Sequence, residues 1–447
     1  MQFNRRNVLS TALFGAGYLG LRSLATGIPT AILAKGKSAF ADEMPLCSKS
    51  KAQFVILATS GLGDPLNANA PGTYGTGALA TIAHNMDPTM VATPLTIGTT
   101  KTTAALPWAS TDVGGQLPAS VLQRMTVWHM MTNTPVHPRE PDVLSLMDTT
   151  APKEMLPSLL ARQLAPCLGT IQNQPITLGA TSPSEGLSFG GQALPIIPPL
   201  ALKATLTNPT GVLAGLTSLQ ALRDDTLSKI NDIYRRTATK SQKAYLDSVI
   251  TSQSQIRSID QNLLSALGSI VDNSVASQIT AAVVLIQMNV TPVVAIHIPF
   301  GGDNHNDTGL VLEAAQTVSG LGSIGFLMNQ LQSMSNASGT LFDQVSFMSL
   351  NVFGRTIGPI NTDGRQHNPN HQVSITIGKP FAPGVLGGIM PVGTGNNADF
   401  GATAIGTVAP GDTLASYGKT VMSAVGIDEG YIGQVITSGT VIKEALA

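Results

Sequence analysis

Five short apolar runs are the feature of this 447-residue chain that most constrains its fold. They occupy residues 53–58, 125–129, 292–299, 345–350 and 373–377. Apolar runs of this length, bounded by glycine-rich polar loops, predict buried β-strands. Helical stretches lie between them and no hairpin signature joins most of them, so crossover connections are expected. We therefore predict an α/β fold, a three-layer α/β/α sandwich with a mostly parallel sheet.

A long stretch without such runs interrupts this pattern at about 166–275. Its first part, 166–215, is rich in Pro, Gly, Thr and Ser, which is typical of irregular structure. Apolar residues then recur at helical spacing from Leu216 to Leu267. We expect an irregular and helical insertion, with its helices packed on the sheet or forming a lid.

Composition excludes several classes of protein. The 25 Lys and Arg nearly balance the 26 Asp and Glu, whereas a nucleic-acid-binding protein needs a basic face, so no nucleic-acid partner is expected. Hydrophobic residues make up 43% of the chain, enough for a large core. Two cysteines are too few for a disulfide scaffold or a zinc ribbon. Cys47 and Cys167 could pair in an oxidising compartment or remain two unrelated thiols.

The N-terminus has the features of an export signal. Arg5 and Arg6 precede an apolar stretch at 8–21, and Ala39-Phe40-Ala41 offers a small-residue cleavage site. The stretch is shorter than the ~20 residues of a membrane span. We predict a twin-arginine signal peptide at 1–41, read by the Tat translocase, and a mature domain at 42–447 in the periplasm or cell envelope, without a stable membrane span. The alternatives are an uncleaved N-terminal anchor and a cytoplasmic enzyme with an accidental pair of arginines.

Three polar loops lie beside predicted strands, where ligands of parallel sheets gather. Asp303 and His305 follow the run 292–299, and a carboxylate with an imidazole suits Zn²⁺, Mn²⁺ or Mg²⁺. An Asx-turn beside a surface histidine would give the same pattern. Asp64 follows the first run and is a further candidate ligand, or a turn-forming aspartate. His129, which ends the second run, is expected to be a buried core histidine.

The third loop joins the last two runs. Arg355 and Arg365 are donors suited to phosphate or sulfate, and His367 and His371 could bind a metal or act as general acid or base. A polar loop that satisfies its own backbone groups is the alternative.

Together these loops resemble a known group of proteins. The chain carries SGLGDPLN at 60–67, GGDNH at 301–305, VFGRT at 352–356 and GRQHN at 364–368, and ends in GTVIKEALA at 439–447. In order and spacing, over almost the whole mature chain, these segments resemble the motifs of a Tat-exported bacterial family of unknown function within the alkaline phosphatase/sulfatase-like superfamily.

The resemblance implies an alkaline phosphatase-like fold and a cluster of divalent metal ions (Zn, Mn, Mg or Ca) at strand ends. The ligand positions that the resemblance implies correspond to Asp64, Asp303, His305 and His367. Val352 and Gln366 stand where the family has a glutamate and an aspartate, so two carboxylates are missing and one ion, or none, is expected.

Two functions follow from this resemblance. One is a metal-dependent hydrolase of small phosphate or sulfate esters, in which Arg355 or Arg365 stabilises the developing charge and His371 assists. The other is a catalytically inactive exported protein with a binding or structural role in the cell envelope.

Overall fold

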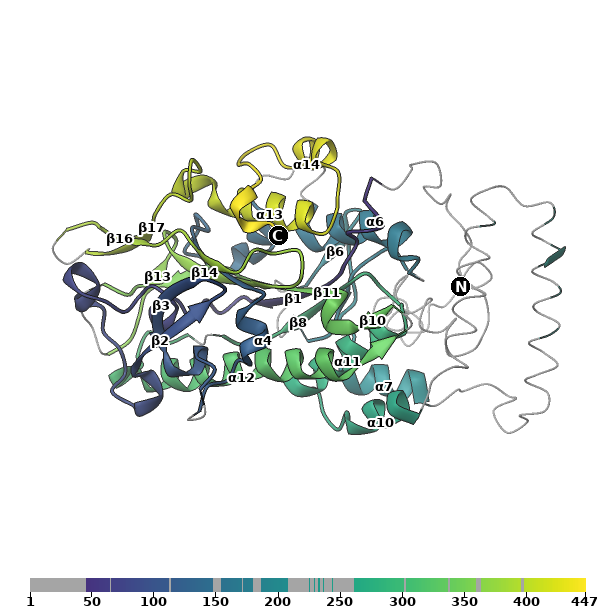
Figure 1. The fold of residues 1–447 in the computed structure, drawn as a ribbon, viewed down its shortest axis with the longest axis horizontal. Helices are drawn as coiled ribbons and strands as arrows, with labels where there is room; N and C mark the ends of the chain where they lie inside the picture. Colours follow the sequence, from purple (N-terminus) through teal and green to yellow (C-terminus); the bar gives the residue numbers. More distant parts are fainter. Residues whose placement is uncertain are drawn as a thin grey trace, which may run out of the picture.

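The computed structural model describes residues 46–447 except 65, 112–113, 148–153, 171, 180–185, 301–302, 337, 359–362, 395–397 and most of 208–260 (Figure 1). The predicted signal peptide and most of the predicted helical run at 216–267 therefore lie outside the described residues.

A seven-stranded sheet forms the centre of the protein. Its order is β15-β4-β14-β11-β1-β8-β5, and all five apolar runs are strands of it, as predicted. The strands are β1 (Phe54–Ser60), β4 (Met125–Met130), β5 (Ile176–Thr177), β8 (Val293–His297), β11 (Val345–Asn351), β14 (Gln372–Ile377) and β15 (Gly384–Leu386).

The sheet is mostly parallel, and β14 is the exception. β1 pairs in parallel with β8 and β11, whereas β14 is antiparallel to both β11 and β4. Between β11 and β14 the described chain forms no crossover helix, only the antiparallel pair β12 (Gly354–Arg355) and β13 (His367–Asn368). A parallel neighbour requires a crossover connection, so this short return leaves β14 reversed.

Helices cover both faces of the sheet, which gives the predicted three-layer arrangement (Figure 1). Along β1, Ile56 and Ala58 face one core, and Val55 and Leu57 face the other, as the two-residue period of a strand requires. The first core includes residues of α7 (Pro199–Thr207), α10 (Gln261–Ser269), α11 (Val275–Gln287) and α12 (Val311–Ser333). The second includes residues of α5 (Glu140–Leu144), α6 (Leu156–Leu168), α13 (Thr413–Ala424) and α14 (Glu429–Val435).

Shorter elements complete the described chain. The helices are α3 (Leu66–Asn69) and α4 (Ala119–Leu122), and two-stranded ladders join β2 (Ala92–Ile97) to β3 (Thr100–Ala105), β6 (Ser188–Phe189) to β7 (Gln192–Ala193), β9 (Ser335–Asn336) to β10 (Gly339–Thr340), and β16 (Ile389–Val392) to β17 (Asp399–Ala402).

The stretch at 166–275 contributes to both the sheet and a helical layer. β5 forms one edge of the central sheet, and α7 and α10 contribute buried leucines to the first core. Cys167, at the end of α6, forms a disulfide with Cys47. This bond joins the first described residues of the chain to the helical layer of the second core.

The long helix α12 begins at a polar cap. The Asp307 carboxylate accepts hydrogen bonds from the backbone N–H groups of Leu312 (2.8 Å) and Glu313 (2.8 Å), which satisfies donors that a helix start leaves open. In the described part of the chain, the segment Thr308–Ser333 is the one helix long and apolar enough to cross a membrane. Half of its most apolar window is buried inside the protein.

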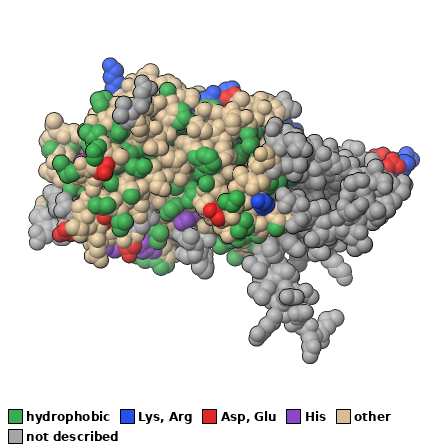
Figure 2. Space-filling model, turned by 90° about the horizontal axis from the view of Figure 1, so that it is seen from below, with side chains coloured by type: hydrophobic (Ala, Val, Ile, Leu, Met, Phe, Trp, Pro, Cys, Tyr) green, Lys and Arg blue, Asp and Glu red, His purple; other side chains and the backbone are tan. Residues whose placement is uncertain are grey.

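The face seen from below carries few charged side chains, and those are scattered among polar and apolar groups (Figure 2). This matches a chain in which only 11% of the residues are charged.

Candidate metal centre

The reversed direction of β14 brings the polar loops to one edge of the sheet. At the carboxyl end of β1, Ser60 pairs with Asn351, the last residue of β11. The first residue of β14, Gln372, pairs with Met130, the last residue of β4. The segment before β14 therefore reaches the same edge as the loops after the other strands.

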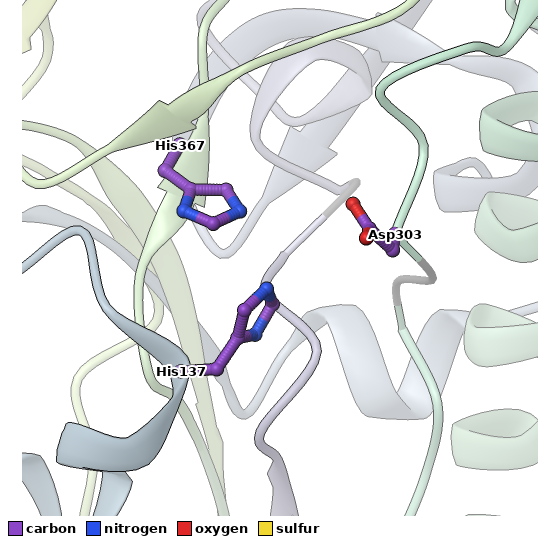
Figure 3. A group of neighbouring side chains, drawn as sticks. All are labelled: His137, Asp303 and His367. Atoms are coloured by element: carbon purple, nitrogen blue, oxygen red, sulfur yellow. The ribbon is translucent and has the colours of Figure 1, made fainter.

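Three side chains from these segments form a compact group. One ligand atom each of His137, Asp303 and His367 lies within 4.8 Å of the others, and Figure 3 shows the three side chains turned toward a common space. His137 follows β4, Asp303 follows β8, and His367 begins β13. Two imidazoles and one carboxylate could hold a divalent metal ion.

Backbone carbonyls orient both imidazoles. The Nδ1 atom of His137 lies 2.6 Å from the carbonyl oxygen of Gly61, and Nδ1 of His367 lies 2.6 Å from that of Pro135. A carbonyl oxygen only accepts, so each Nδ1 carries a hydrogen, which leaves Nε2 as the ring atom that can bind a metal through its lone pair. Metal-ligating histidines are commonly held in this way. Partial burial lowers the pKa of His367, which favours its neutral form.

His305 adjoins this group. Its Nε2 lies 3.0 Å from Oδ1 of Asp303 and 3.0 Å from Nε2 of His367. Its Nδ1 is buried without a hydrogen-bond partner in the described chain. Asp303, His305 and His367, three of the four ligands expected from the sequence, are therefore neighbours.

Arg355 lies behind Asp303. Its side chain is fully buried, its Nη1 is 3.6 Å from Oδ1 of Asp303, and its Nη2 donates to the carbonyl of Leu62 (2.6 Å). Burial lowers the pKa of Arg355, and Asp303 opposes that shift. Gly63, with φ of +98°, leaves room here, since a Cβ atom would lie 3.0 Å from Nε of Arg355. The result is a buried cation beside the exposed carboxylate of the group.

Phe353 forms an aromatic wall for the imidazoles. Its ring stacks on His367 at a centroid distance of 4.2 Å and meets the edge of His137 at 4.8 Å. These contacts restrict the ring orientations that present Nε2 to the group.

Asp64 lies outside the group of His137, Asp303 and His367 and is used by the backbone. Its Oδ1 accepts from the N–H of Leu66 (2.9 Å) and its Oδ2 from the N–H of Val373 (2.8 Å). Complete burial raises the pKa of Asp64 to about 7, despite these bonds and Arg355. In this structure Asp64 joins the loop after β1 to the start of β14.

Arg365 forms a buried ion pair with Glu313 on α12. Nη2 lies 3.0 Å from Oε1 of Glu313, and Nε pairs with the other carboxylate oxygen. Arg365 also donates to the carbonyls of Thr356 (3.1 Å) and Ala83 (2.6 Å). These contacts hold its guanidinium within the protein.

His371 pairs with His129 in the core. Nε2 of His371 lies 2.9 Å from Nδ1 of His129, whose Nε2 lies 2.8 Å from the carbonyl of Pro71. Burial lowers the pKa of His129 to about 4 and that of His371 well below its usual value, so both rings are neutral at pH 7. His129 is the buried, hydrogen-bonded histidine that the sequence predicted.

The two positions that lack the motif carboxylates have different environments. Val352 is fully buried in the second core, whereas Gln366 is exposed. Neither residue adds a carboxylate to the group of His137, Asp303 and His367, which could hold a metal ion and is called the metal group below.

Sequence reasoning placed Asp303 and His367 in a metal site but missed His137. The rule that ligands gather beyond the carboxyl ends of parallel strands also applies to His137, because His137 follows the apolar run 125–129 as Asp303 follows the run 292–299.

Comparison of the chain with protein-family models, curated proteins and solved structures finds no match.

Proposed function

We propose that this protein is an exported hydrolase of small phosphate or sulfate esters that binds one divalent metal ion through His137, Asp303 and His367. The observation that carries the proposal is the meeting of two oriented imidazole lone pairs with a carboxylate within 4.8 Å. Three protein ligands leave a coordination position open, as in catalytic rather than structural zinc sites. Nitrogen and carboxylate donors favour Zn²⁺ or Mn²⁺ over Ca²⁺, which prefers oxygen.

The residues present account for metal binding and for anion binding. A divalent ion held there would supply Lewis-acid chemistry toward the ester. His305 lies close enough to Asp303 and His367 to act as a further ligand or to hold a proton. The Arg355 guanidinium, 3.6 Å from Asp303, supplies positive charge where an ester anion would gain negative charge.

Export is part of the proposal and rests on the twin-arginine segment of the sequence. The Tat pathway moves proteins that are already folded, so metal could be loaded in the cytoplasm before the chain reaches the cell envelope. Resemblance to the alkaline phosphatase/sulfatase-like superfamily supports phosphate or sulfate esters as the substrate class.

Val352 and Gln366 favour a second candidate function. With an apolar side chain buried at one motif position and an exposed amide at the other, the site has a single carboxylate in its metal group. The same site could bind metal and a small anion without turnover, which would make the protein an envelope binding protein.

Metal analysis and ester turnover test both candidates. The mature chain, folded in the cytoplasm, should contain about one Zn²⁺ or Mn²⁺ by elemental analysis. His137→Ala should weaken metal binding by more than about 100-fold, because loss of a group that only orients a ligand already costs about 10–100-fold. His84→Ala is the matched control, since His84 stacks on Tyr74 outside the metal group.

Turnover of p-nitrophenyl phosphate or sulfate separates the two functions. The hydrolase should lose turnover in Arg355→Lys while keeping its metal, because lysine cannot reproduce the guanidinium geometry. A wild-type protein that binds metal but turns over neither ester would support the binding function. Equal metal content in wild type and His137→Ala would refute the metal site.

A further inference from the structure

Two hydrogen bonds join the end of β1 to the segment that carries His137. One links Nδ1 of His137 to the carbonyl of Gly61 (2.6 Å). In the other, the Thr59 hydroxyl donates to Oε1 of Glu140, with both side chains buried. We call this pair of bonds the β1–α5 clasp. It fixes 137–140 against 59–61 at two points.

The direction of Thr59 follows from the strand period. Val55 and Leu57 face the second core, which also contains Val143 and Leu144 of α5. Thr59 is two residues beyond Leu57 on the same face, so its hydroxyl meets Glu140, the first residue of α5. A hydroxyl thus stands where the strand pattern would place another apolar residue.

The segment between the two bonds is short and stiff. Pro138 lies between His137 and Glu140, and Pro141 follows Glu140, so two prolines restrict the backbone here. Glu140 is 1% exposed. Burying a carboxylate is costly, so a buried one is retained only with polar partners. Because the segment is stiff, fixing Glu140 also fixes the backbone of His137 three residues earlier.

We propose that Thr59 and Glu140 are positioning residues that set the place of His137 as a metal ligand. This inference rests on the proposed function, since it assigns the clasp to the same metal site. The Gly61 carbonyl sets the orientation of the His137 ring, and the Thr59–Glu140 bond sets the distance between its backbone and the end of β1. Neither Thr59 nor Glu140 belongs to the group of His137, Asp303 and His367 that would hold the metal.

Metal affinity measured with Zn²⁺ and Co²⁺ alone tests the inference. Thr59→Val keeps the shape of the side chain and removes the donor, and should weaken Zn²⁺ binding by about 10–100-fold, the usual effect of losing a group that orients a ligand. Thr59→Ser restores the hydroxyl and should recover most of the affinity. The Co²⁺ absorption spectrum of Thr59→Val should shift as the ligand geometry changes, a result that simple destabilisation does not give.

Thr291→Val is the matched control. Thr291 is fully buried, its hydroxyl donates to the carbonyl of Gln174 (2.8 Å), and it lies just before β8, at the opposite end of that strand from Asp303. This variant should lose stability and keep the Zn²⁺ affinity of the wild type. Glu140→Met, which keeps the length of the side chain and removes the acceptor of the Thr59 hydroxyl, provides a second variant if Thr59→Val does not fold, and should also weaken Zn²⁺ binding.

The outcomes distinguish the two proposals. If wild type binds Zn²⁺ and His137→Ala does not, but Thr59→Val and Glu140→Met bind as tightly as wild type, the positioning role is wrong and the metal site stands. Equal weakening by Thr291→Val would also overturn the positioning role, because the effect would then be general. If wild type itself binds no Zn²⁺, the proposed function fails first and the positioning role fails with it.

Discussion

Replacing Arg365 by methionine tests whether this arginine stabilises the fold or belongs to the site. Its side chain is 2% exposed and that of its partner Glu313 is 1% exposed, with Nη2 and Oε1 separated by 3.0 Å. Arg365→Met fills similar space but leaves a buried carboxylate without its cation. Breaking one side of such a pair costs about 3–5 kcal/mol, and we expect a loss of that size in the free energy of unfolding at pH 8.

The loss should depend on pH in a defined direction. Burial raises the pKa of Glu313, and Arg365 is the main influence that lowers it. Without Arg365 the folded-state pKa of Glu313 rises further above its unfolded value. A carboxyl with a raised folded pKa favours the folded state at low pH, and this contribution disappears as pH rises through the folded pKa. The free energy of unfolding of the variant should therefore be closest to that of wild type near pH 4–5 and differ from it most near pH 8.

Urea unfolding followed by circular dichroism at pH 5 and pH 8 measures this difference. Arg139→Met is the matched control, because Arg139 pairs with Asp142 at 2.9 Å while 49% and 29% exposed. An exposed pair contributes no more than about 1 kcal/mol. If the free energy of unfolding at pH 8 fell no more in Arg365→Met than in Arg139→Met, the structural role of Arg365 would be refuted. A catalytic role would then again be the better explanation.

Two further predictions concern stability. The pKa of Asp64 is raised to about 7, so its contribution to the free energy of unfolding is present below about pH 4 and is lost as pH rises through 7. In Asp64→Asn the free energy of unfolding should therefore lack this decrease between pH 5 and 8, and an unchanged pH dependence would contradict the assignment. The Cys47–Cys167 disulfide joins residues 120 positions apart, so its reduction should lower the free energy of unfolding by about 2–5 kcal/mol. Identical urea midpoints with and without reductant would show that the bond does not form.

The sequence determined the strands and the edge of the sheet where the site forms. A strand that is buried on both faces must be apolar along its length, so short apolar runs predict such strands. All five predicted runs are strands of the central sheet. It also placed Asp303, His305 and His367 beside strand ends, where the structure brings them together. These inferences succeeded because they depend on short stretches of chain.

The tertiary structure decided what each polar side chain does. Asp64 and Val373 are 309 residues apart, yet their hydrogen bond occupies a carboxylate that the motif alone presents as a ligand. Arg365 meets Glu313 across 52 residues, and His137 joins Asp303 only because β4 ends at the same edge as β8. The role of a polar group is set by the partners that surround it once water is excluded, and those partners come from distant segments that no local pattern specifies.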